Sequence, residues 1–288
     1  MERTWVLVFM VIVAIDSAAC GDAAEPAARA ATALTGTTIV AAGDIATPAS
    51  NDTATSNLVV NIDPALVVTL GDNAYEDGTL SQFRSLYDPT WGRFKSKTFP
   101  SPGNHEYHVT NARGYVDYFG VSTGLHSRVV GNWLIISVDS ETNLSGQVTA
   151  LRNLLARDNH TCEMAFWHRP RWSSGAVHGS IPGMQGLWAA AVAGGVDVVL
   201  NAHDHNYQRF APMNANGAPA TNGTREFVVG TGGGSLYDFT NASPAPRVKI
   251  KAFGVLKMTL AANSYQWEFH KVGRGTGTIA DSGTGTCH

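Results

Sequence analysis

The feature that most constrains this chain is a pattern repeated five times: an apolar, β-branched run that stops at a side chain able to bind a metal ion. In the run VDVVLNAHDH, only Asp204 separates His203 from His205. Residues i and i+2 of an extended backbone point to the same side, so both imidazoles should face one spot. Neutral imidazole is a common metal ligand, and the pair predicts a metal site. The competing interpretation is two half-exposed histidines without a metal.

The other four runs end in a carboxylate, phenol, amide or imidazole. They are TTIVAAGD up to Asp44, PALVVTLGDNAY with Asp72 and Tyr75, KTFPSPGNHE with Asn104, His105 and Glu106, and CEMAFWH up to His168. In open α/β sheets, ligands bind beyond the carboxyl ends of the strands. One polar residue in such a place is most simply a solvated strand cap. Five together predict one shared site, provided that the strands converge.

Helix-like segments lie between these runs, namely TATSNLVVNI, TLSQFRSLY, SGQVTALRNLLARD and MQGLWAAAVAGG. Continuous apolar strands that alternate with amphipathic helices predict a layered α/β fold with buried sheets. The runs RVVGNWLIISVD, REFVVGTGGG and GVLKMTLAANSYQWEFHKV favour antiparallel strands, so we expect mixed sheets. The GTGGG run lacks the Lys-Ser/Thr of a P-loop and is interpreted as a tight loop near the site.

The first residues have the composition of an export signal. After MERT comes the short apolar stretch WVLVFMVIVAI, followed by small residues. It is too short for a comfortable membrane span, so residues 1–19 are predicted to be a signal peptide. The motif SAAC suggests lipidation of Cys20, and cleavage after Ala19 or near the ARA motif is the alternative. Residues 20–36 are predicted to be an Ala/Thr-rich linker and residues 37–288 one catalytic domain.

The leader predicts an extracytoplasmic protein, which is secreted, periplasmic or lipid-anchored at the cell surface. Contact with a membrane is expected only through the signal or the lipid anchor. The chain has 288 residues, 15% of them charged, and a formal net charge of −3. This composition provides no basic field, so nucleic acid is not expected as a specific partner.

Two cysteines remain outside the leader, Cys162 and Cys287. An even number of cysteines in an oxidising compartment favours one disulfide, which would join the C-terminal tail to the strand CEMAFWH. The alternative is two free thiols. The tail itself, GRGTGTIADSGTGTCH, is rich in glycine and threonine.

The motifs together resemble those of the calcineurin-like metallophosphoesterases, and most closely those of the purple acid phosphatases. The resemblance runs from Asp44 to His205 in the order of that family and includes GDNAY, GNHE and AHDH. The common Asp-x-His opening is replaced by DIA, as in purple acid phosphatases, which instead carry the tyrosine of Gly-Asp-x-x-Tyr. The family usually has glycine where Ala46 and Ala202 stand. The resemblance implies a four-layer αββα sandwich of two mixed sheets flanked by helices.

The resemblance also implies two metal ions per chain, with Asp72 as the bridging ligand. One metal would be completed by Asp44, Tyr75 and His205, and the other by Asn104, His168 and His203. Carboxylates and a phenolate suit iron(III), whereas the nitrogen-rich set suits zinc, manganese or iron(II). A tyrosine binds as phenolate only beside a strongly charged cation, and otherwise Tyr75 would be a core aromatic residue.

The implied reaction is hydrolysis of a small-molecule phosphate monoester by metal-bound hydroxide. His105 is the first candidate to protonate the leaving group, and His178 is a candidate to contact the substrate, with a solvated loop histidine as the alternative for His178. Glu106 is expected either to orient His105 or to be a surface carboxylate. A phosphodiesterase or nucleotide pyrophosphatase would use the same ligands. A surface protein that binds metal or phosphate without turnover is a less favoured alternative. The sequence leaves the physiological substrate and the oligomeric state open.

Overall fold

The computed structural model describes residues 1–2, 35–49 and 51–288. Cys20 and nearly all of the predicted signal peptide and linker lie outside the described residues, so these assignments stay predictions. From Thr37 onward the chain forms two β-sheets and the helices that flank them. No helix within the described ranges is long and apolar enough to cross a membrane.

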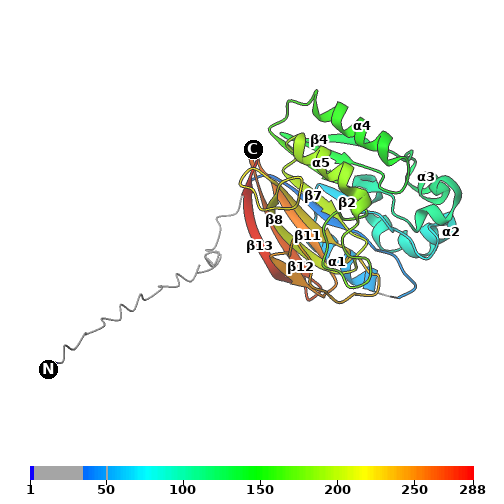
Figure 1. Ribbon diagram of the computed structural model, residues 1–288. Helices are drawn as coiled ribbons and strands as arrows, with labels where there is room; N and C mark the ends of the chain where they lie inside the picture. The colour runs from blue at the N-terminus through cyan, green and yellow to red at the C-terminus, as the bar shows by residue number, and fades with distance from the viewer. Residues whose placement is uncertain (3–34, 50) are drawn as a thin grey trace. The chain divides into compact units, whose positions relative to one another are not determined.

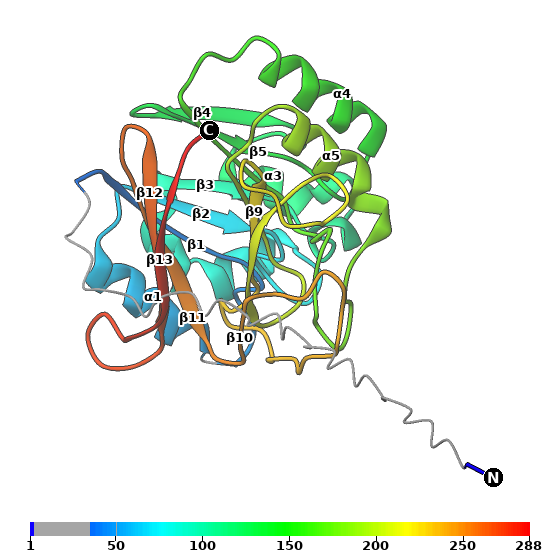
Figure 2. The same ribbon diagram turned by 60° about the vertical axis from the view of Figure 1, so that its left-hand side comes forward.

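The first sheet has six strands in the order β13-β12-β11-β1-β2-β3. β1, β2 and β3 are parallel and lie side by side, whereas β11, β12 and β13 add to this core in antiparallel pairs (Figure 2). The strands are β1 (Thr37–Ala42), β2 (Leu66–Leu70), β3 (Thr98–Ser101), β11 (Gly254–Leu260), β12 (Ser264–Lys271) and β13 (Thr278–Thr286).

The second sheet has seven strands in the order β10-β8-β9-β7-β6-β5-β4. Its centre, from β5 through β6 and β7 to β9, is parallel, and its outer strands pair antiparallel. The strands are β4 (His126–Val130), β5 (Trp133–Ser137), β6 (Cys162–Phe166), β7 (Val198–Asn201), β8 (Tyr207–Met213), β9 (Thr224–Val229) and β10 (Val248–Ile250). Both sheets are therefore mixed, as expected.

Both faces of the central strands of the second sheet, β5, β6, β7 and β9, are buried, which explains their continuous apolar runs. In β6, Met164 and Phe166 face the core shared with the first sheet, while Ala165 packs with the helices on the other face. Helices α4 and α5 cover that outer face and lie side by side (Figure 1). The helices are α1 (Asn51–Ile62), α2 (Leu80–Gln82), α3 (Arg113–Phe119), α4 (Leu144–Leu155) and α5 (Gln185–Ala193).

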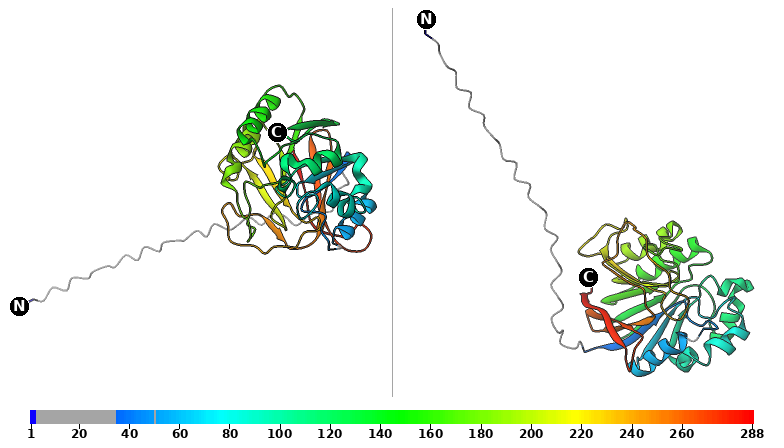
Figure 3. Two further views of the ribbon diagram at one scale, coloured as in Figure 1. Left: turned by 90° about the vertical axis from the view of Figure 1, so that its right-hand side faces the viewer. Right: turned by 90° about the horizontal axis from the view of Figure 1, so that it is seen from below.

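Helix α1 contacts β11 on the first sheet and also packs against the 3₁₀ helix Trp91–Lys97. The blue and cyan helical segments and the green helices α4 and α5 accordingly lie on opposite sides of the strands (Figure 3). This arrangement confirms the expected αββα sandwich.

The C-terminal tail is a strand, although its Gly/Thr-rich sequence has no apolar pattern typical of one. It forms β13 at the edge of the first sheet. β13 pairs antiparallel with β12 along most of its length. A Cβ on Gly283 or Gly285 would lie 2.3 Å from Trp267 or Tyr265 respectively, so the absence of side chains lets the tail rest on these rings. Backbone pairing and close packing, which depend on β12, make this segment a strand.

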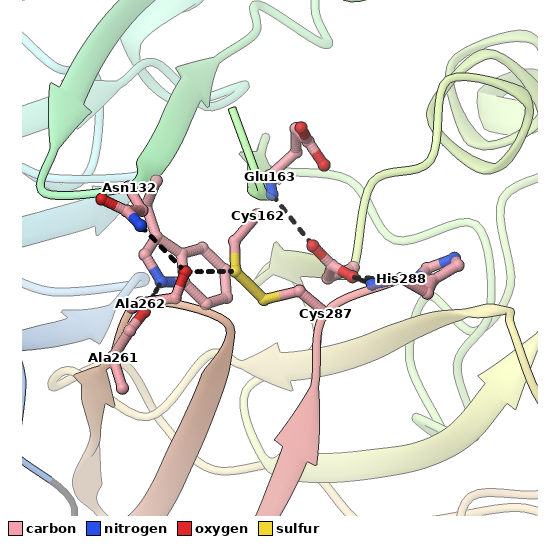
Figure 4. The surroundings of a disulfide bond; sticks show 9 residues. Asn132, Cys162, Glu163, Ala261, Ala262, Cys287 and His288 are labelled. Atoms are coloured by element: carbon pink, nitrogen blue, oxygen red, sulfur yellow. Dashed lines mark hydrogen bonds and ion pairs between the residues drawn. A yellow bond between two sulfur atoms is a disulfide. The ribbon is translucent and has the colours of Figure 1, made fainter. Parts of the chain in front are cut away.

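The tail ends in the predicted disulfide. Cys162, the first residue of β6, is bonded to Cys287 across a separation of 125 residues, with 5.3 Å between the Cα atoms. Figure 4 shows the bond joining the end of the chain to β6. The backbone N–H and Nδ1 of His288 both contact a carboxylate oxygen of Asp197, at 3.0 and 2.7 Å. The alternative of two free thiols is excluded in this structure.

Candidate metal centre

The five apolar runs bring their terminal polar residues together. Asp44, Asp72, His168 and His203 each lie two residues beyond the end of a strand, β1, β2, β6 and β7 respectively. Asn104 lies three residues beyond the end of β3. β1, β2 and β3 are parallel in one sheet, and β6 and β7 are parallel in the other. The contacts below show that these carboxyl ends meet at one place, as the strand-end pattern predicts.

The first group of donors surrounds the phenol of Tyr75. Its hydroxyl lies 3.0 Å from Oδ1 of Asp44, 3.3 Å from Oδ2 of Asp72 and 3.2 Å from Nε2 of His205. All four residues are buried. Tyr75 is therefore surrounded by polar groups and is not a purely apolar core residue.

The second group surrounds the imidazole of His168. Its Nε2 lies 3.2 Å from Oδ2 of Asp72, 3.2 Å from Oδ1 of Asn104 and 3.1 Å from Nδ1 of His203. The ligand atoms of Asp72, His168 and His203 all lie within 4.8 Å of one another. Because Oδ2 of Asp72 belongs to both groups, this carboxylate is placed where a bridging ligand would be.

The tautomers of two histidines test whether the cluster fits a metal. Nδ1 of His168 lies 2.9 Å from the carbonyl oxygen of Leu70, and Nδ1 of His205 lies 2.9 Å from that of Ser235. A carbonyl can only accept a hydrogen bond, so each Nδ1 carries the proton. In the neutral ring, the lone pair of each Nε2 then points into the cluster, which is the usual arrangement of metal-binding histidines. The donor set therefore fits divalent or trivalent cations.

The backbone at these residues is unusual. Asp44, Asp72 and His203 have φ values of 56°, 48° and 69°, in the left-handed region that side-chain-bearing residues rarely adopt. Such conformations are concentrated at functional sites, where surrounding contacts hold them. One such contact is the N–H of His203, which donates to Oδ2 of Asp44 at 2.8 Å.

The charges of the cluster are strongly coupled. Burial alone would raise the pKa of Asp72 and lower that of His168, but their mutual attraction reverses both shifts. The pKa of Asp72 falls well below its usual range and that of His168 rises to about 10. Burial, together with the nearby Asp44 and Asp72, raises the pKa of Tyr75 well above its usual value. A metal ion binding here would displace the second proton of His168, on Nε2, and leave the proton on Nδ1, because histidine binds metals as the neutral ring.

Glu106 has a role that neither sequence-based expectation describes. Its side chain is fully buried and accepts the backbone N–H groups of Asp72 at 3.0 Å, Asn73 at 2.7 Å and Gly103 at 2.7 Å. Burial raises its pKa to about 8. Glu106 is thus not a surface residue and makes no hydrogen bond to the ring of His105 among the described contacts. It holds the GDNAY and GNHE loops together.

The two positions where the family usually has glycine tolerate alanine here. Neither Ala46 nor Ala202 has a positive φ, and both are fully buried. A Cβ on Gly43 would lie only 2.5 Å from the Cβ of Ala202. The absence of a side chain at Gly43 therefore leaves room for the methyl group of Ala202. The GTGGG run forms the expected tight loop, since Gly232 and Gly234 donate to the carbonyl groups of Gly43 and Asp44.

A cleft of about 400 Å³ opens onto the cluster. His105 and His178 both line it. Nε2 of His105 is 3.8 Å from Oδ2 of Asp72, and the ring of His178 stacks on His203 with 3.9 Å between centroids. Both candidate catalytic histidines thus lie at the edge of the cluster.

Tyr237 is a cleft residue that the sequence does not indicate. It stacks on His205 with 4.1 Å between centroids and an interplanar angle of 9°. No motif marks this tyrosine, because only the folding of the loop after GTGGG brings it to His205. Trp167 and Trp172, which flank His168 in sequence, are instead buried in the core beneath α4 and α5.

Comparison with known proteins agrees with this geometry. The family model for the calcineurin-like phosphoesterases matches residues 37–207. This match covers more than half of the chain, which therefore belongs to the calcineurin-like phosphoesterase family. Members of this family are generally metal-dependent hydrolases of phosphoesters and typically bind two metal ions. Among curated proteins, none matches the sequence of this chain.

Solved structures share the fold at low sequence identity. A purple acid phosphatase, PPD1, from seeds of yellow lupin (Lupinus luteus) has a TM-score of 0.73 and 20% identity over 87% of this chain and 53% of its own. GAP50, the anchor in the inner membrane complex of Plasmodium, has a TM-score of 0.69 and 14% identity over 88% and 89%. A dimetal phosphatase from Danio rerio has a TM-score of 0.54 and 12% identity over 88% and 99%. This chain spans about half the length of the lupin enzyme.

Proposed function

We propose that this chain is an exported binuclear-metal phosphatase that hydrolyses phosphate monoesters, with residues 37–288 as its catalytic domain. The observation that carries the proposal is the convergence of seven metal-binding side chains from five strand ends on one buried cluster. Asp44, Tyr75 and His205 would hold iron(III), whereas Asn104, His168 and His203 would hold zinc, manganese or iron(II), with Asp72 shared. Bound there, the two metal ions would polarise the phosphoryl oxygen and lower the pKa of water enough to supply the nucleophile.

The protein itself would orient the ester and handle the leaving group. His105 lines the cleft beside Asp72 and is the first candidate to donate a proton to the leaving alkoxide. His178 lines the same cleft beside His203 and would bind a phosphate oxygen through its ring. No serine or cysteine is needed as a nucleophile in this scheme.

The charge of the cleft supports a monoester over a nucleotide polyphosphate. Among the described residues that line it, none is lysine or arginine, and Glu76 adds a carboxylate at the mouth. That side chain is 72% exposed and lies 4.0 Å from the ring of His105. A second or third phosphate on the substrate would therefore meet repulsion from this carboxylate. The cation beside the cluster is Arg169, whose guanidinium lies 2.7 Å from Glu141 and 3.2 Å from Nε2 of His203, so both of these groups already hold it.

Export is supported by the disulfide between Cys162 and Cys287, since such bonds persist mainly in oxidising compartments. The leader predicted from the sequence agrees with this. We propose that the protein is secreted, periplasmic or held at the cell surface by a lipid on Cys20.

The decisive experiment compares the hydrolysis of 4-nitrophenyl phosphate with that of bis(4-nitrophenyl) phosphate by the full chain, together with metal analysis. Preference for the monoester supports the proposal, whereas preference for the bis-ester favours the phosphodiesterase. Protein that contains two metal ions but hydrolyses neither ester, nor any other in a phosphoester panel, would favour a non-catalytic binding protein. His203→Ala should abolish hydrolysis, while the control variant His126→Ala, on β4, should keep it.

The metal pair can be tested by colour. An iron(III)–phenolate centre absorbs visible light, so the metal-loaded protein should show a band that vanishes in Tyr75→Phe. A colourless and fully active enzyme would remove iron(III) from the proposal and leave a pair of divalent ions.

A further inference from the structure

Asp204, the middle residue of the HDH motif, is a buried carboxylate that faces away from the metal cluster. Its side chain is 0% exposed. It accepts the backbone N–H of His178 at 3.2 Å and that of Gly179 at 3.0 Å, and it also accepts the hydroxyl of Ser173. All three donors belong to the loop that follows β6 and carries His178 across the cleft.

The loop is wrapped closely around this carboxylate. A Cβ on Gly175 would lie 2.0 Å from Cγ of Asp204, so only glycine permits the approach. Gln208 adds a second attachment, since its amide oxygen accepts the N–H of Ser174 at 2.7 Å and its amide nitrogen donates to Ser173 at 2.8 Å. The loop is therefore attached to the same segment of chain that bears the two histidines of the motif.

The ring of His178 has few constraints of its own. Within the part of the chain that the structure describes, its imidazole makes no side-chain hydrogen bond. It stacks on His203 at an interplanar angle of 23° and lies 5.7 Å from the ring of Tyr237. Its position thus depends on this stack and on the backbone that Asp204 holds.

We propose that Asp204 is a positioning residue that keeps His178 over the phosphate-binding cleft. One short segment then presents metal ligands on one side and holds the substrate-contacting loop on the other. The inference rests on the proposed function, because it takes His178 to contact the phosphoester. It differs from a purely structural role in that the effect of Asp204 on hydrolysis must pass through His178.

A double-mutant cycle separates these two roles. Asp204→Asn keeps the shape of the side chain but places an amide N–H₂ against the backbone N–H donors of the loop. We expect this variant to lower kcat/KM by about 10- to 100-fold, the loss expected when a group is displaced by about 1 Å. In the His178→Ala background the same substitution should have little further effect. Losses that multiply in the double variant would overturn the proposal.

Asp139 is a matched control. It is also a fully buried aspartate, lies two residues beyond β5, and is bound by Tyr107 and by the N–H of Glu141. Any loss caused by Asp139→Asn should be the same with and without His178. Ser173→Ala, which removes one of the three donors to Asp204, should reproduce the Asp204→Asn effect at smaller size and remain folded if the aspartate variant does not.

A crystal structure of Asp204→Asn provides a test that does not need turnover. Displacement of the His178 ring from its stack on His203 supports the proposal, and an unmoved ring overturns it. A wild-type protein that hydrolyses no phosphoester would contradict the proposed function, while the structural result would still decide whether Asp204 positions His178. If the wild-type protein is active and the losses caused by Asp204→Asn and His178→Ala are independent, only the positioning role is contradicted.

Discussion

Strands β6 and β7 are polar at both ends, but the two ends are built differently. Beyond their carboxyl ends, His168 and His203 lie in the candidate metal cluster, with their ring nitrogens 3.1 Å apart. At their amino ends, Cys162 begins β6 in a disulfide and Asp197 immediately precedes β7. Both ends are buried, and the carboxyl ends open onto the cleft lined by His203.

The difference lies in how the polar groups are satisfied. The carboxylate of Asp197 accepts the N–H of Glu163 at 2.9 Å as well as the two nitrogens of His288. These bonds join the C-terminus to the sheet and leave little for a ligand to do. At the carboxyl ends, the facing ring nitrogens of His168 and His203 lie 3.1 Å apart, Oδ2 of Asp72 lies 3.2 Å from the same His168 nitrogen, and the backbone of His203 is strained. A cation bound between them would be coordinated by these nitrogens and the carboxylate together. We therefore assign chemistry to the carboxyl ends and stability to the amino ends.

The largest expected effect is on activity at the carboxyl ends. Asp72→Ala removes the carboxylate shared by both donor groups, and we expect kcat/KM to fall by on the order of 10³-fold or more. The matched variant at the other end, Asp197→Asn, should keep kcat/KM within about twofold at 25 °C while lowering Tm. Steady-state kinetics on 4-nitrophenyl phosphate check both. Substantial turnover by Asp72→Ala would contradict the bridging role.

The next effect is on stability at the amino ends. Replacing both Cys162 and Cys287 by serine removes a cross-link that stabilises the folded chain by up to about 5 kcal/mol in the chain-entropy model. Tm should fall by roughly 10 °C, with kcat/KM at 25 °C unchanged. Calorimetry of the double variant measures this. A large loss of activity without loss of stability would show that the two ends are not separate.

The pH dependence of Tm should also report on the amino ends of β6 and β7, through the buried side chain of Glu163. Burial, together with Asp158 and Asp197, raises the pKa of Glu163 to about 8 from an unfolded value of 4.5. A carboxyl group with a raised pKa in the folded state contributes stability that is present below pH 4.5 and is lost as the pH rises through 8. Glu163→Gln should therefore flatten the fall of Tm between pH 5 and about pH 8.5. An unchanged pH profile would contradict this assignment.

The smallest effect concerns substrate choice at the mouth of the cleft. Glu76→Gln removes one exposed negative charge, so kcat/KM for ATP relative to 4-nitrophenyl phosphate should rise by roughly two- to tenfold at low salt. Using the ratio of two substrates cancels any general effect on the nearby His105. Asp63→Asn, whose side chain is 86% exposed and pairs with Lys97, is the control. An equal change in both variants would remove the electrostatic argument.

The sequence predicts more of the site than of the sheets. A parallel strand with both faces buried is a continuous apolar run, and a polar residue just beyond it is conspicuous. Asp44, Asp72 and His168 all have this position in the sequence. Edge strands carry no such signal. β13 is a Gly/Thr-rich segment that is extended only because β12 offers unpaired backbone groups and aromatic rings. Glu106 shows the same limit, because nothing local reveals that its carboxylate will accept backbone N–H groups from two loops.

The amino-acid sequence alone determined the class of fold, the set of donor side chains and the cysteine pair, because apolar periodicity and residue chemistry are local properties. The tertiary structure decided that Asp72 lies between the two donor groups, that Tyr237 covers His205, and that Asp204 holds the loop of His178. These are contacts between segments far apart in the chain. Their distances depend on how two sheets pack, a property that no single segment encodes.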